Sequence, residues 1–267
     1  MRITILPETG ELPQALDQAL ESRRATASGP HVVINVALQP PNSLLHDGHC
    51  WSRYPPKRLI ELTHAAMRRA ARADFLVHAS YVMVGARADA KDAGSRLQPL
   101  IDAALEAEQI VLSSRRPACV LRLGYLYGPH SRDLLAYRRA FRVGRPYWSG
   151  PGTVRQRYLH SADAAAALLA AAAQRPVRRV LYATDNQAAS FAAFMNHFAK
   201  LIGNPIPLRL PGLSRPLSRI VVNENHMQMT ELATGAVAVT PRPRGFEPRF
   251  ATYRSGLRAV VDEWSAR

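Results

Sequence analysis

Lysine and cysteine are scarce in this chain of 267 residues. Of its 35 basic side chains only Lys57, Lys91 and Lys200 are lysine, and the two cysteines, Cys50 and Cys119, are too few for a disulfide framework. No apolar run approaches the roughly 18 residues that suggest a membrane span. The N-terminus has no signal-peptide pattern. We therefore expect a cytoplasmic protein without a membrane span.

The net charge is nevertheless +15, a balance that suits polyanionic partners. The arginines are spread along the chain, and neither a lysine-rich tail nor the aromatic and basic pattern of an RNA-binding sheet is present. Nucleic acid is therefore not the partner that we expect.

Acidic residues are absent from two long spans, 134–162 and 186–223. The first span contains six arginines: Arg138, Arg139, Arg142, Arg145, Arg155 and Arg157. Paired guanidinium groups grip phosphates and carboxylates through two hydrogen bonds each. If the two spans face each other, they form a positive cleft for an anionic small molecule. If they do not, they are a solvated basic face.

Apolar, β-branched runs alternate with helical patterns up to about residue 125, which favours an α/β fold with a parallel sheet. The expected strands are 2–6, 31–38, 75–80 and 118–123, and the clearest helices are 57–71 and 97–114. In such folds ligands bind beyond the carboxyl ends of the strands. The segments that follow residues 38, 80 and 123 are therefore the candidate site.

Five segments, in chain order, carry a more specific pattern: "VVINVAL", "FLVHASYVMVGA", "VLRLGYLYGPH", "RQRYLHSADAAAALLAA" and "GFEPRFATYRSGLRAVVDEW". Together they resemble the extended short-chain dehydrogenase/reductase family, the NAD-dependent epimerases and dehydratases. The resemblance implies a Rossmann-like core of flanking helices and a parallel sheet, in residues 1–130 and completed by about 155–185. Residues 131–154 and 186–267 would then be the remnant of a small substrate lobe.

The chain departs from this family at its start, where the glycine-rich loop that lets the backbone approach a pyrophosphate is missing. Its first strand resembles the family's third, which predicts an N-terminally truncated Rossmann-like sheet. The alternative is that residues 1–30 form a shortened substitute. On the truncated interpretation we expect no cofactor, with NAD(P) as the alternative.

The second departure lies in the helix of residues 97–114. Glu108 fits a glutamate that follows the family's catalytic Tyr-x-x-x-Lys pair, and this alignment puts Leu100 at the tyrosine position and Ala104 at the lysine position. The tyrosine of the family transfers a proton, and the lysine lowers its pKa. Leucine and alanine can do neither, so the helix is expected to be a scaffold. Ser80 matches the family's third catalytic residue.

The candidate site residues follow from these matches. The candidate catalytic residues are Ser80, Tyr81 and Tyr125, and the candidate substrate-binding residues are Arg155, Arg157, Tyr127 and His130. The loop "HDGHC" (46–50) offers only three crowded metal ligands, so no metal is expected.

The leading hypothesis is a degenerate, non-redox family member that acts as a binding or partner subunit and holds an anionic ligand in an arginine-lined cleft. One alternative is a working NAD(P)-dependent epimerase, dehydratase or reductase on a nucleotide-sugar or similar substrate. Another is a non-redox cyclase or isomerase that reuses the pocket around Ser80. A shortened sheet exposes an edge, so we expect a homodimer or a heteromeric complex.

Overall fold

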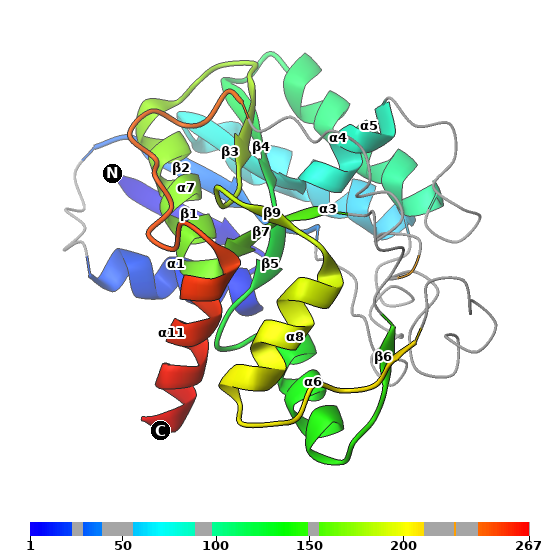
Figure 1. Cartoon of the computed structure of the whole chain (residues 1–267). Helices are drawn as coiled ribbons and strands as arrows, with labels where there is room; N and C mark the ends of the chain where they lie inside the picture. Colours follow the sequence, from blue (N-terminus) through cyan, green and yellow to red (C-terminus); the bar gives the residue numbers. More distant parts are fainter. Residues whose placement is uncertain are drawn as a thin grey trace.

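A computed structural model describes residues 1–22, 29–38, 56–88, 98–148, 155–210, 227 and 240–266. Its main element is a five-stranded sheet in the order β1-β2-β3-β4-β8 (Figure 1). The strands are β1 (Arg2–Leu6), β2 (His31–Asn35), β3 (Phe75–Tyr81), β4 (Ala118–Leu123) and β8 (Val180–Ala183). All neighbouring pairs are parallel. The parallel sheet that the alternating pattern predicted is therefore confirmed.

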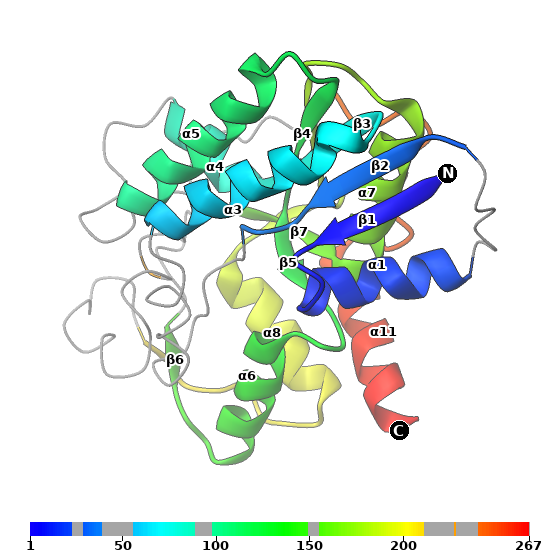
Figure 2. The same ribbon diagram turned by 180° about the vertical axis from the view of Figure 1, so that it is seen from behind.

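Helices cover both faces of this sheet. Figure 2 shows α3 and α5 on one side and α1 and α7 on the other. Their bounds are α1 (Glu11–Glu21), α3 (Pro56–Arg69), α5 (Gln98–Ser113) and α7 (Ser161–Gln174). Every residue of β3 is buried, as expected for a strand enclosed between two helical layers. A short 3-10 helix (Ala70–Arg72) and α4 (Val82–Ala88) flank β3.

A second group of elements is built around aromatic side chains. Its strands are β5 (Tyr125–Tyr127), β6 (Tyr147–Trp148), β7 (Gln156–His160), β9 (Ala188–Ala189) and β10 (Arg209–Leu210), and its helices are α6 (Arg132–Arg142), α8 (Phe191–Leu201) and α11 (Tyr253–Ser265). Tyr158 and Phe194 stack at its centre, with ring centroids 4.4 Å apart. Since β5 starts just after β4, this second core begins where the main sheet ends.

Polar side chains cap the N-terminal ends of several of these helices. Ser131 and Ser190 accept hydrogen bonds from backbone N–H groups in the first turns of α6 and α8, which satisfies donors that a helix end otherwise leaves open. Asp163 in the first turn of α7 accepts from the backbone N–H groups of Arg249 and Phe250, at 2.9 and 3.1 Å. The carboxylate thereby ties the segment before α11 to the main core.

Residues 1–35 form a strand, a helix and a second parallel strand, with only residues 22–30 between α1 and β2. A strand–helix unit therefore precedes the strand that the family match begins with. The N-terminal truncation and the proposed domain boundaries stay predictions. None of the helices in the described part of the chain is long and apolar enough to cross a membrane.

Candidate functional site

The candidate site lies where the parallel strands of the main sheet end, the place at which α/β folds bind ligands. It includes residues 36–38 after β2, Ser80 and Tyr81 at the end of β3, and Gly124 and Tyr125 after β4. The first turn of α1 follows β1 at the same end of the sheet. The sequence predicted that most of these segments lie close together, because the carboxyl ends of parallel strands meet at one edge of the sheet. The structure places them at that edge.

Ser80 is fully buried, beside Arg122 in the register of β3 and β4. Among the described residues its hydroxyl has no hydrogen-bond partner. A buried polar group without a partner costs about 1–3 kcal/mol. The Ser80 hydroxyl can therefore gain a favourable interaction from a ligand atom or a water that reaches it.

A polar row continues from Ser80 along the same face of β3. His78 lies two residues earlier, and its Nδ1 atom is 2.9 Å from the Nδ2 atom of Asn35. Burial lowers the pKa of His78 to about 4, although the nearby Glu108 carboxylate raises it. The imidazole is therefore neutral at neutral pH, and its buried Nε2 atom has no partner within the described residues.

Glu108 of α5 and Arg122 of β4 form a buried ion pair next to this row. Arg122 donates through Nε to Oε1 of Glu108 at 3.1 Å and through NH2 to Oε2 at 2.6 Å. Its NH1 group also donates to the hydroxyl of Tyr182, at 3.1 Å. The guanidinium lies directly against Gly85, where a Cβ atom would collide with it. The pair holds α4, α5 and the sheet together behind the candidate site.

Leu100 and Ala104 on α5 are both buried and belong to the main hydrophobic core. They are the residues that stand at the tyrosine and lysine positions of the resembled family. Neither side chain can transfer a proton or hold a ribose. In the structure these two positions of α5 contribute packing to the core.

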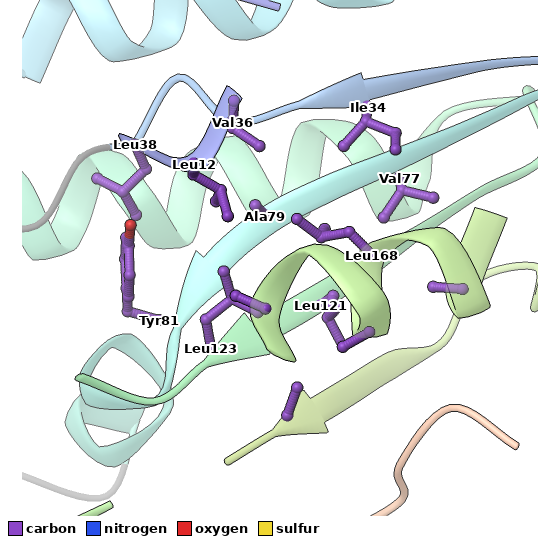
Figure 3. Packing of buried hydrophobic residues seen from close by; sticks show 14 of the residues in the cluster. Leu12, Ile34, Val36, Leu38, Val77, Ala79, Tyr81, Leu121, Leu123 and Leu168 are labelled. Atoms are coloured by element: carbon purple, nitrogen blue, oxygen red, sulfur yellow. The ribbon is translucent and has the colours of Figure 1, made fainter. Parts of the chain in front are cut away.

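Tyr81 points to the opposite face of the sheet from Ser80, since side chains alternate along a strand. Figure 3 shows its hydroxyl oxygen directed towards Leu38, at the ends of β2 and β3. Burial raises the pKa of Tyr81 above its usual value, and the charge of Glu11 adds to the rise. Ser80 and Tyr81, which the sequence grouped as candidate catalytic residues, therefore face different layers.

Glu11, Asp133 and Tyr125 form an acidic group next to Tyr81. The hydroxyl of Tyr125 donates to Oδ2 of Asp133 at 2.8 Å, and burial together with this carboxylate raises the pKa of Tyr125 well above its usual value. Burial, together with the charge of Asp133, raises the pKa of Glu11 to about 7. The Oε1 atom of Glu11 is buried and has no hydrogen-bond partner within the described residues.

The sequence analysis missed both acids. Glu11 approaches Gly128 and Ser161, which are more than a hundred residues away, and no local pattern encodes that contact. The available signal was an acidic residue in the first turn of the first helix, where the resembled family has its glycine-rich loop. On the truncated interpretation this helix has no counterpart in the family's cofactor site, so the acid was not a candidate.

Tyr127 and His130 occupy different surroundings. Tyr127 is 1% exposed and lies against Gly256 of α11, so its ring is part of the aromatic core and lines no open cleft. His130 is partly exposed, and its Nε2 atom lies 3.3 Å from the Gln14 amide of α1. Of the two, His130 is the residue placed near the start of α1.

Arg155 and Arg157 flank the buried Gln156 at the start of β7. Arg155 is exposed, whereas Arg157 is half-buried and lies close enough to Asp185 to lower the pKa of that acid. Burial is nevertheless the larger effect and raises the pKa of Asp185 to about 7. The substrate-binding role of the two arginines stays a prediction.

The loop of residues 46–50 lies outside the described residues. Within the described ranges, no group of three or more histidine, cysteine, aspartate or glutamate side chains could hold a metal ion. Cys119 is a free, buried cysteine in β4, and burial raises the pKa of its thiol to about 12. A thiol that stays protonated is a poor nucleophile, so Cys119 is a packing residue.

Solved structures share this fold over nearly the whole chain. The human epimerase family protein SDR39U1 (isoform 2) with NADPH matches 98% of this chain and 99% of its own, with a TM-score of 0.70 and 18% identity. MoeE5 in complex with UDP-glucose and NAD matches 100% and 99%, with a TM-score of 0.68 and 21% identity. The Thermotoga maritima UDP-glucose 4-epimerase matches 100% and 99%, with a TM-score of 0.69 and 13% identity. The chain therefore has the fold of the NAD-dependent epimerases and short-chain dehydrogenases.

One curated protein is similar in sequence. It is a 3-diazoavenalumate denitrifying reductase from Streptomyces sp., 31% identical over 163 residues, which are 59% of this chain and 51% of the relative. The match thus spans about half the length of the relative. No family model matches the chain.

These findings correct one expectation. We expected no cofactor, because the glycine-rich loop is missing. That expectation is wrong, since structures that share the fold contain NAD or NADPH. The error came from treating the loop as indispensable to the fold's cofactor site.

The start of α1 fits a phosphate group in one respect. Gly10 precedes the helix at a φ of 139°, which glycine adopts readily, and no side chain caps the helix. The backbone N–H groups of Glu11 and Leu12 have no partner within the helix. Such groups, together with the helix dipole, attract phosphate. An ionised Glu11 carboxylate at the same helix end repels phosphate.

Proposed function

We propose that the protein is an NAD(P)H-dependent reductase that works without a tyrosine proton donor. The observation that carries the proposal is an uncapped first helix together with an apolar pair, Leu100 and Ala104, in α5. By the resemblance, this pair stands at the positions of the family's catalytic tyrosine and lysine. The first feature supports a bound dinucleotide. The second favours a reaction that needs no proton at a carbonyl oxygen.

Three groups of this chain would hold the reactants. The N–H groups of Glu11 and Leu12 would bind phosphate, the turn of residues 36–38 would border the nicotinamide, and the unpartnered Ser80 hydroxyl would donate to a polar atom of the bound molecules. The bound nicotinamide would supply a hydride. The buried side chains of Leu38 and Tyr81, which lie together at the ends of β2 and β3 (Figure 3), would keep water out of this end of the sheet.

The Streptomyces relative suggests the substrate class, since its name describes a reductase that removes nitrogen from a diazo compound. When hydride adds to a carbon that carries a diazonium group, a C–H bond forms and the C–N bond breaks. The electron pair of that C–N bond leaves with dinitrogen. No oxygen becomes negatively charged, so no acid is needed, which agrees with the apolar residues at positions 100 and 104. We therefore propose an aromatic diazo carboxylate as the substrate class.

A second candidate function is a binding or partner subunit that holds the dinucleotide without turnover. It is favoured by the same two apolar positions, because a protein that has lost catalysis has no need of the tyrosine and lysine. The arginines of the 134–162 span would then hold an anionic ligand. The two candidates differ in whether the nicotinamide is oxidised.

The test is a reduction assay with NADH and NADPH that carry deuterium at C4, using an aryl diazonium carboxylate as the probe. We expect the dinucleotide to be oxidised with dinitrogen release, and deuterium to appear on the carbon that lost nitrogen. Ser80→Ala is expected to slow the reaction, with the exposed Ser113→Ala as the matched control. Saturable binding without oxidation would favour the partner-subunit function, and absence of binding would exclude both.

A further inference from the structure

Glu11 stands at an unusual place for an acid. It is the first residue of α1, the helix that follows the first strand of a β1-α1-β2 unit. In folds of this kind the pyrophosphate of a dinucleotide sits at the N-terminus of that helix. A carboxylate at this point carries the same sign of charge as the ligand that the helix end attracts.

The side chain of Glu11 has little room to move away. Gly128 of the loop after β5 lies against both Oε1 of Glu11 and the Ser161 hydroxyl of α7, since a Cβ atom at Gly128 would come within 3.0 Å of that Oε1. The same oxygen is buried and has no hydrogen-bond partner within the described residues. Among the described residues, Glu11 forms no ion pair with a basic side chain. The carboxyl is thus enclosed beside the helix end without a compensating charge.

We propose that Glu11 sets the affinity for the dinucleotide, which binds when the Glu11 carboxyl is protonated, so that one proton is taken up with the cofactor. This inference rests on the proposed function, because it concerns the same cofactor site. Glu11 would determine the affinity for the cofactor, and other residues would contact the reacting atoms.

The surroundings of Glu11 favour the protonated carboxyl. Burial raises its pKa to about 7, and Asp133 of α6 adds to the rise. The charge of Glu11 in turn raises the pKa of Tyr81 of β3, where burial is the larger cause. A neutral carboxyl no longer repels the pyrophosphate, and its O–H can donate to a phosphate oxygen.

Other polar groups nearby already have hydrogen-bond partners. Tyr125 of β5 is bonded to Asp133, and Asp163 of α7 accepts from two backbone N–H groups near residue 250. His130, in the loop before α6, lies against Gln14 of α1. Of these groups, Asp133 is the one with a charge that acts on Glu11, so Glu11 is expected to titrate near neutral pH.

The experiment measures the dissociation constants of NADH and NADPH between pH 6 and 8.5 by nicotinamide fluorescence. Wild type is compared with Glu11→Gln and with Glu8→Gln, a matched control in the exposed part of the same loop. We expect the wild-type affinity to fall up to tenfold for each pH unit above the pKa of Glu11. Glu11→Gln should bind about tenfold to a hundredfold more tightly than wild type at pH 8.5, with little pH dependence. Glu8→Gln should behave as wild type.

Calorimetry in two buffers of different ionisation enthalpy counts the protons directly. Wild type should take up close to one proton per NADH at pH 8, and Glu11→Gln should take up none. NADH is the probe here because it lacks the titrating 2′-phosphate. Equal affinity and equal proton uptake in wild type and Glu11→Gln would overturn the inference while leaving the proposed function intact. No binding to any of the three proteins at any pH would overturn the proposed function, and the inference with it.

Discussion

At the scale of single residues, the buried polar row behind the site determines how the protein responds to substitution and to pH. The residues at its two ends differ in whether their polar atoms have hydrogen-bond partners. Glu108 and Arg122 satisfy each other, while His78 and Ser80 are left with unpartnered atoms. The sequence predicted Ser80 near the end of a strand and Glu108 within a helix, and both residues lie in such elements. It could not show that they border one polar row, because that requires the register of β3 against β4 and the packing of α5.

Glu108→Gln should destabilise the protein strongly. The side chains of Arg122 and Glu108 are only 12% and 3% exposed, so the substitution leaves an uncompensated charge in a buried place. Breaking a buried ion pair in this way costs about 3–5 kcal/mol. Urea unfolding at pH 7 measures it, with the exposed Glu106→Gln on the same helix as the control. A loss no larger than that of the control would mean that the ion pair does not hold α5 to the sheet.

His78 should make the protein sensitive to acid. Its pKa is about 4 in the folded protein, whereas an unfolded histidine titrates near 6.5. The unfolded state therefore binds more protons below pH 6.5, and the free energy of unfolding falls as the pH decreases from 6.5 to 4. His78→Gln should remove about 2 kcal/mol of this fall between pH 7 and 4.5.

The measurement is urea unfolding of wild type and His78→Gln at both pH values, with the exposed His64→Gln as the control. The difference between His78→Gln and wild type should shift in favour of the variant at low pH. A difference that stays constant with pH would show that His78 is not the group that titrates.

At the scale of elements, the main sheet was predictable and the second core was not. The strand expected at 118–123 is observed as Ala118–Leu123, and the helix expected at 97–114 is observed as Gln98–Ser113. Both are continuous apolar or periodic runs that propensity alone identifies. The helices of the second core, α6, α8 and α11, pack through aromatic contacts between distant segments, and Tyr158 with Phe194 is an example from this core. Such contacts have no period that a sequence can display.

Gly256→Ala tests how closely α11 packs on the second core. Alanine favours a helix over glycine by about 1 kcal/mol, so propensity alone predicts a more stable protein. However, the new Cβ atom would collide with the hydroxyl of Tyr127. We expect a net loss of about 1–3 kcal/mol from this overpacking. Thermal unfolding measures whether the variant is more or less stable than wild type, with the exposed Arg258→Ala on the same helix as the control. A gain in stability would show that α11 packs less closely on the second core.

At the scale of the whole molecule, the candidate site lies between a main α/β core and a second, aromatic core. The two acid-free spans and their arginines led us to expect an arginine-lined cleft in a chain whose net charge is +15. In the structure part of this charge is used for packing, since the Arg138 guanidinium lies over the Trp264 ring at 4.9 Å. Composition showed the excess of arginine, but it could not show which arginine side chains pack against other residues and which are available to bind a ligand.

The sheet edge at β1 leads us to predict a homodimer or a complex with a partner chain. Among the described strands β1 pairs only with β2, and an open edge invites pairing with another chain. Light scattering coupled to size-exclusion chromatography at high protein concentration measures the mass. A monomer at every concentration, together with no partner in a pull-down, would contradict this prediction.

The central claim is that this fold still binds a nicotinamide dinucleotide although its glycine-rich loop is missing. Thermal unfolding with increasing NADH or NADPH, at pH 6 where Glu11 is protonated, tests it most directly. A ligand at 100 times its Kd stabilises the folded state by about 2.7 kcal/mol, which raises the Tm by roughly 5–10 °C for a chain of this size. We predict a saturable rise of this order. An unchanged Tm at millimolar concentrations of both dinucleotides would show that the protein does not bind them.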